Sequence, residues 1–174
     1  MRDAFIRIFN EFGQAKTQPF AGNMFASFIR NDIPSLMRGY FDTVPVNWEA
    51  SAGQGRWADA PWIAAINPLI TDTPQDGYYP VYLFTNSLDA VYLSLNQGMT
   101  RLVDELGVEQ ARETLQHRAK IIRTRLTGEY EKRFSSEPID LQPTGPTSRL
   151  ALYQPGHVFG IRYDRDTLPN NNSY

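Results

Sequence analysis

The stretch from Ser51 to Gln97 constrains the fold of this 174-residue chain more than any other part of it. It alternates short apolar, aromatic-rich runs with turns rich in Gly, Asn, Asp and Pro, a pattern that predicts strands joined by loops. The predicted strands cover residues 44–50, 61–66, 79–85 and 90–95. Loops are expected at 53–59 and 67–77, and the four residues 86–89 predict a hairpin turn.

Helical periodicity frames this stretch on both sides. Helices are predicted over residues 3–15, 22–31 (which Pro34 breaks or restarts), 99–106 and 108–126, followed by a loop over 135–149 and a last strand over 157–163. This order predicts one α/β (α+β) domain over residues 1–165, with a mixed, mostly antiparallel central sheet flanked by helices. Residues 166–174 are expected to form a tail or linker.

Composition narrows the class of protein further. Apolar residues make up 41% and charged residues 21%, as in globular domains. The 17 basic and 19 acidic residues give a net charge of −2, so any nucleic-acid binding must use a local basic patch. The absence of cysteine excludes disulfides and thiolate metal sites, and agrees with a cytoplasmic location. No apolar run reaches the roughly 18 residues of a membrane span.

Sequence motifs for catalysis or metal binding are missing. His117 and His157 lie on different predicted elements without metal-ligand spacing, and P-loop, H-E-x-x-H and G-x-S-x-G patterns are absent. Four aspartates flank turns, where Asp favours bonds to its own backbone: Asp59, Asp72, Asp76 and Asp89. We therefore expect no catalytic residue, metal or cofactor, and treat a small metal-dependent nuclease as the alternative.

Aromatic residues concentrate around the loop between the first two predicted strands. Trp57 and Trp62 follow the glycine-containing segment at 53–55, and strand alternation places Tyr78 and Tyr82 on one face with Tyr79 and Leu83 offset from it. Such rings predict an aromatic-walled pocket beside a polar loop, which would suit a flat ligand such as a nucleobase. Packing of the same rings in the core is the alternative.

The long predicted helix carries the local excess of positive charge. Between residues 111 and 134 there are seven basic and three acidic residues. The candidates for phosphate contacts are Arg118, Lys120, Arg123 and Arg125. A solvated outer helix face is the alternative interpretation of this stripe.

Three motifs within residues 48–98 resemble a known family. They are Gly53-Gln54-Gly55-Arg56-Trp57 through Pro61-Trp62-Ile63-Ala64, then Gly77-Tyr78-Tyr79-Pro80-Val81-Tyr82-Leu83, and finally Val91-Tyr92-Leu93-Ser94-Leu95-Asn96-Gln97-Gly98. Together they resemble the N-terminal DNA-binding domain of McrB, a subunit of a modification-dependent restriction enzyme that cuts methylcytosine DNA. The helices on either side agree only in kind.

The resemblance implies a function and a set of site residues. Domains of that family bind duplex DNA, flip a modified cytosine (5-methyl or 5-hydroxymethyl) out of the helix, and hold it in a pocket. The matching pocket residues here would be Trp62, Tyr79 and Leu83. Gln54 or Arg56, next to Trp57, would fill the gap in the duplex, and Tyr130 or Phe134 would supply a further pocket aromatic.

The resemblance also implies partners. They are double-stranded DNA that carries a modified base and a nuclease or motor module of a restriction system, with no membrane and no cofactor. Such a chain would be a targeting domain, with cleavage supplied elsewhere. A reader of another modified base, such as N6-methyladenine, or of RNA remains an alternative.

Overall fold

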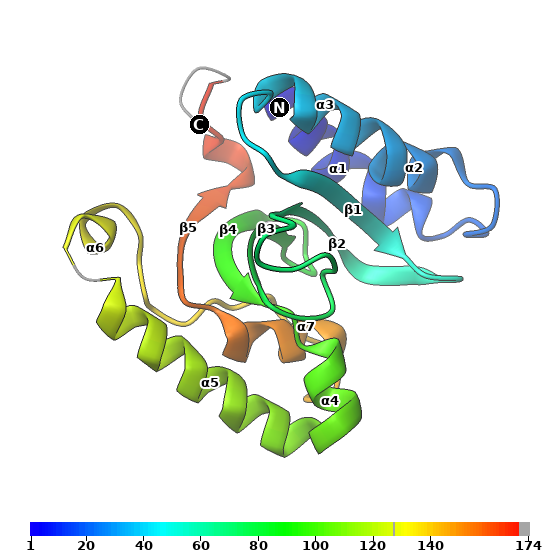
Figure 1. Cartoon of the computed structure of the whole chain (residues 1–174). Coiled ribbons are helices and arrows are strands. Elements are labelled where there is room, and N and C mark those ends of the chain that lie inside the picture. The colour runs from blue at the N-terminus through cyan, green and yellow to red at the C-terminus, as the bar shows by residue number, and fades with distance from the viewer. Residues whose placement is uncertain (127, 171–174) are drawn as a thin grey trace.

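A computed structural model describes residues 1–126 and 128–170 and contains one five-stranded antiparallel sheet. Each strand lies beside the next strand in the sequence, in the order β1-β2-β3-β4-β5, so the sheet is a simple meander (Figure 1). The strands are β1 (Asn47–Gly53), β2 (Trp57–Ile66), β3 (Tyr78–Phe84), β4 (Ala90–Gln97) and β5 (Phe159–Asp164). The predicted fold class is confirmed.

The N-terminal helices cover one face of this sheet (Figure 1). They are α1 (Arg2–Ala15), α2 (Met24–Ser27) and α3 (Ile33–Tyr40), with a π-helical turn at Phe28–Asp32 between the last two. Phe5 of α1 packs edge-on against Tyr82 and Phe84 of β3, with ring centroids 5.0 and 5.5 Å apart. The helix predicted over residues 3–15 is confirmed. Pro34 lies in the first turn of α3, where a missing N–H is tolerated, so a new helix begins there.

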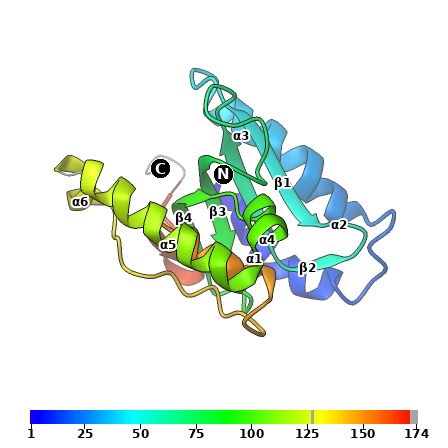
Figure 2. The ribbon, with the colours of Figure 1, turned by 60° about the horizontal axis from the view of Figure 1, so that its bottom comes forward.

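The remaining helices lie on the other side of the sheet (Figures 1 and 2). They are α4 (Thr100–Leu106), α5 (Val108–Arg125), α6 (Glu129–Arg133) and α7 (Arg149–Tyr153). Gln97 at the end of β4 donates from Nε2 to the Leu115 carbonyl of α5 at 3.0 Å, which ties that helix to the sheet. The sequence predicted α4 and α5, but neither α6 nor α7.

The predicted boundaries of the first two strands and of the loop between them were wrong. Residues 53–59 were expected to form a loop, but only residues 54–56, the β1–β2 turn, lie between the two strands. Strand β1 therefore begins and ends three residues later than the predicted 44–50, and β2 begins four residues before the predicted 61–66. Ser51 is opposite Trp62 and Gly53 is opposite Trp57, so Ala52 alone faces residues 58–61 in a bulge that accommodates Pro61.

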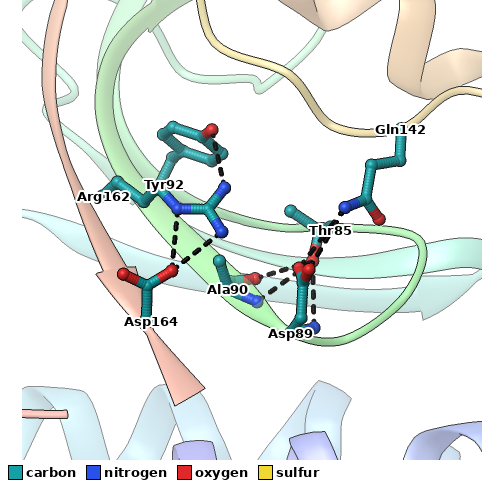
Figure 3. Close-up of polar contacts among 7 residues, drawn as sticks. All are labelled: Thr85, Asp89, Ala90, Tyr92, Gln142, Arg162 and Asp164. Carbon is teal, nitrogen blue, oxygen red and sulfur yellow. Dashed lines mark hydrogen bonds and ion pairs between the residues drawn. The ribbon is translucent and has the colours of Figure 1, made fainter. Parts of the chain in front are cut away.

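The β3–β4 turn holds the long connection that leads to α7. Thr85 Oγ1 donates to Asp89 Oδ1 at 2.7 Å, and Gln142 Nε2 donates to Asp89 Oδ2 at 3.3 Å (Figure 3). The Asn86 N–H also donates to the Leu141 carbonyl at 3.1 Å. These bonds fix residues 141–142 against the turn and so position α7 beneath the sheet.

The segment after β5 returns to the N-terminal helix. Arg165 Nη2 donates to Asn10 Oδ1 at 2.7 Å, and Leu168 is buried in the main core. The packed body therefore includes the first residues of the expected tail as far as Leu168. Residues 171–174 of that tail lie outside the described residues.

Candidate functional site

A cavity of about 690 Å³ opens between the first half of β2, β3 and the N-terminal end of α7. Several regions of the chain enclose it. The β1–β2 side contributes residues from Ser51 to Trp62, the β2–β3 loop contributes Pro74 and Gln75, and β3 contributes Tyr79, Val81 and Leu83. Its far wall comes from Asn96, Thr100 and residues 147–150 and 153. A volume of this size accommodates a small ligand.

The three expected pocket residues all line this cavity. Trp62 of β2 lies directly opposite Leu83 of β3, and directly opposed residues project from the same face of a sheet. Tyr79 lies four residues before Leu83 and therefore projects from that face as well. The predicted alternation along β3 is confirmed, since Tyr82 faces α1 instead.

Tyr79 is buried in the wall of the cavity, with 4% of its surface exposed. Its hydroxyl donates to the Pro74 carbonyl at 2.6 Å, and this bond holds the β2–β3 loop against the cavity. Burial raises the pKa of the Tyr79 phenol, with a further contribution from the nearby Tyr153. The phenol therefore stays a neutral hydrogen-bond donor at physiological pH.

The β1–β2 turn projects beside the cavity mouth. Gly53 and Gly55 have φ values of 135° and 66°, and a Cβ on Gly53 would meet the Arg56 carbonyl oxygen at 2.0 Å. Only glycine permits this close approach. Gln54 and Arg56 are both exposed, and within residues 1–126 and 128–170 neither side chain forms a hydrogen bond or an ion pair. Both can therefore reach an external partner.

Trp57 lines the cavity but is anchored to the N-terminal helical layer. Its indole packs edge-on against Phe12 and Phe20, with ring centroids 5.6 and 5.1 Å apart, and Nε1 donates to the Gln18 carbonyl at 2.8 Å. This packing explains why β2 begins at Trp57 rather than at the predicted residue 61. Trp57 holds the base of the turn in place.

The far wall contains residues that the sequence reasoning missed. Leu150 and Tyr153 of α7 line the cavity, and burial raises the pKa of the Tyr153 phenol. Phe134, one candidate for the further pocket aromatic, packs instead with Ala119, Val158 and Phe159 and is not among the lining residues. The side chain of Tyr130, the other candidate, lies outside the described residues. The Leu-x-x-Tyr spacing after Ser148 was the available signal for α7.

Two cations lie at the cavity itself: Arg56 and Arg149 line it. Arg149 is exposed, and its Nη1 donates to Thr100 Oγ1 at 3.0 Å, which orients the guanidinium at the rim. Exposed arginines beside a cavity can contact phosphates. The sequence reasoning did not single out Arg149.

The basic stripe of α5 divides into two groups. Arg123 is held internally, because its Nη2 and Nε donate to the His157 and Val158 carbonyls at 2.6 and 2.8 Å. Lys120 and Arg125 are exposed, and Arg118 is half-buried. These residues lie in the C-terminal half of α5, which leads from α4 towards α6 (Figure 1), and none of them lines the cavity.

The histidines and aspartates of the described part of the chain do not form a metal centre. His157 is 2% exposed and its Nδ1 lies 2.7 Å from Ser94 Oγ, as in a core histidine. Burial, together with the charge of Arg123, lowers its pKa to about 4. Across the described residues no group of three or more His, Cys, Asp or Glu side chains could hold a metal ion.

The comparison with protein families shows which family the chain belongs to. The family described as "MrcB-like, N-terminal domain" matches residues 7–174. The chain belongs to this family. The McrB-like N-terminal domain is consistent with a DNA-binding module of a restriction system, and the motif resemblance is thereby confirmed over nearly the whole chain.

Two other comparisons add no relatives. Neither the curated proteins nor the solved structures contain a match to this McrB-like domain. Within its described residues, no helix is long and apolar enough to cross a bilayer.

Proposed function

We propose that this McrB-like domain recognises a modified cytosine, 5-methyl or 5-hydroxymethyl, in duplex DNA by flipping the base into the cavity. The observation that carries the proposal is that three predicted pocket residues lie together. Trp62, Tyr79 and Leu83 come from two strands and yet line one cavity beside an exposed polar turn. Family membership supports DNA as the ligand.

The energetics support a flipped base. Unstacking a base costs a few kcal/mol, which is least when the base is damaged or mismatched. A base–aromatic stack contributes about 1–3 kcal/mol, so one or two rings are of the right magnitude to offset that cost. Leu83 offers an aliphatic surface that a C5 methyl group could contact.

The β1–β2 turn and the basic residues complete the proposed interface. Gln54 or Arg56 would enter the gap that the flipped base leaves, where Arg can bind guanine acceptors and Gln a base edge. Arg149 at the rim, together with the exposed Lys120 and Arg125 of α5, would contact phosphates. Cleavage would then come from a nuclease or motor module of the restriction system.

A binding comparison tests this function. One duplex sequence is prepared with a central cytosine, 5-methylcytosine, 5-hydroxymethylcytosine or N6-methyladenine, and binding is measured at fixed salt. Tighter binding of a 5-modified cytosine supports the proposal. Preference for N6-methyladenine, preference for RNA, or metal-dependent cleavage by this chain alone would each replace it with another function.

A further inference from the structure

Three polar side chains that line the cavity already have hydrogen-bond partners within the protein. Tyr79 is bonded to Pro74, and Ser51 Oγ is bonded to the Gly53 N–H at 3.1 Å. The amide of Asn96 is engaged at both ends, because Nδ2 donates to the Tyr153 carbonyl at 3.2 Å and Oδ1 accepts from the Gln97 N–H at 2.7 Å. The side chains of Tyr79, Ser51 and Asn96 are therefore already engaged.

The backbone of β2 provides further polar groups at the cavity. Strand β2 begins at Trp57, but its pairing with β3 covers only Trp62–Ala64. Ala58, Asp59 and Ala60 thus lie on a strand that has no β3 partner, and all three line the cavity. An unpaired strand edge presents a row of N–H and C=O groups that can bind an added partner.

Local sequence makes this edge accessible and keeps it in place. Ala58 and Ala60 carry the smallest side chains after glycine, so a planar ligand can approach the backbone closely. The bulge opposite Ala52 separates this half of β2 from the regular ladder. Lys16 Nζ donates to the Asp59 carbonyl at 2.9 Å and anchors the segment to α1, so this carbonyl already has a partner and the other backbone groups of residues 58–60 are the candidates for a ligand.

We infer that the unpaired edge of β2 over residues 58–60 reads the hydrogen-bonding edge of the base held in the cavity. This inference rests on the proposed function and names the specificity element within it. Cytosine presents an N4 amino donor beside the N3 acceptor, whereas thymine presents an O4 acceptor beside an N3–H donor. A fixed row of backbone donors and acceptors distinguishes these two patterns, although both bases can carry a 5-methyl group.

The test compares 5-methylcytosine with thymine, each placed opposite an abasic site so that neither base has a pairing partner to lose. Single backbone amides at residues 58, 59 and 60 are replaced by esters, which removes one N–H and leaves every side chain in place. The same replacement at Ala65, on β2 but away from the cavity lining, is the matched control. Circular dichroism and thermal melting confirm that each protein is folded.

We expect the unaltered domain to prefer 5-methylcytosine. At least one ester at 58–60 should reduce this preference by about 2- to 12-fold, the loss of one neutral hydrogen bond, while the Ala65 ester leaves it unchanged. Asp59→Ala tests the alternative of recognition by a carboxylate, and Tyr153→Phe tests recognition by a phenol. Each should leave the preference within about twofold, because neither removes a backbone group.

Three results would overturn the inference: all three esters retaining the preference, a side-chain variant losing it, or an unaltered domain that binds modified duplex yet treats the two bases alike. Failure of the proposed function has a different signature. In that case the unaltered domain does not distinguish modified from unmodified paired duplex in the first place.

Discussion

Removal of the Trp62 indole separates base stacking from general DNA binding. Trp62 is partly exposed, lies opposite Ser51 and Leu83, and lines the cavity. A base–aromatic stack is worth about 1–3 kcal/mol, so Trp62→Ala should weaken binding to modified duplex by about 5- to 160-fold. Affinity for unmodified duplex, which depends on phosphate contacts, should hardly change.

The same structure supplies the controls. Trp48 projects from the opposite face of the sheet, stacked on Phe41 with ring centroids 5.3 Å apart, and does not line the cavity. Trp48→Ala removes an equal ring, and should reduce stability without a selective loss of modified-duplex binding. Trp62→Phe keeps an aromatic face and should recover most of the affinity.

Fluorescence anisotropy with labelled modified and unmodified duplexes measures these effects, and thermal melting reports the fold. Because Trp62 is only partly buried, its truncation should cost less than the 3–5 kcal/mol typical of a buried tryptophan. A folded Trp62→Ala protein that binds modified duplex normally would refute the pocket assignment. An equal loss of modified-duplex binding in Trp48→Ala would show that the loss comes from reduced stability of the fold.

Three further predictions concern the turn, the basic helix and the buried histidine. A 2-aminopurine beside the modified cytosine should brighten on binding, and Gln54→Ala with Arg56→Ala should abolish that signal; full brightness in the double variant would leave the turn as a mere connection. Lys120→Ala and Arg125→Ala should weaken binding to modified and unmodified duplexes alike, and each should reduce the salt slope by about one, whereas unchanged slopes would assign these residues to solvent. His157 has a pKa of about 4 in the folded state, below the usual value of 6.5, so the unfolded chain takes up a proton first as the pH falls. The free energy of unfolding should therefore decrease by roughly 3 kcal/mol between pH 6.5 and 4, as followed by urea denaturation, and His157→Gln should lose this component; an identical pH profile in the variant would contradict the assignment.

Sequence reasoning succeeded where structure depends on local periodicity. The apolar face of α1, the β3–β4 hairpin and the long helix α5 each follow from side-chain spacing within one element. Alternation along β3 also placed Tyr79 and Leu83 together, and the motifs pointed to the family. These features could be predicted because neighbouring residues in the chain determine them.

Tertiary contacts decided the rest. The first half of β2 is a strand because Trp57 packs on Phe12 and Phe20, residues that come about 40 positions earlier in the chain. Helix α7 has only five residues, too few for a helix that is stable alone, and it forms where Leu150 and Tyr153 pack beneath the sheet. The local signal for α7, the Leu-x-x-Tyr spacing after Ser148, is too short to predict a helix by itself, and the first half of β2 has no such signal.

The site itself shows the same division. Sequence alone determined which aromatic and polar residues were available, and strand alternation determined which of them share a face. Only in the tertiary structure does α7 lie across the cavity. There too, Arg123 donates to the His157 and Val158 carbonyls, and residues 58–60 have no partner on β3. The physical reason is that burial, long-range hydrogen bonds and strand pairing arise between segments far apart in the chain, and these interactions decide which side chains and backbone groups remain free to bind a ligand.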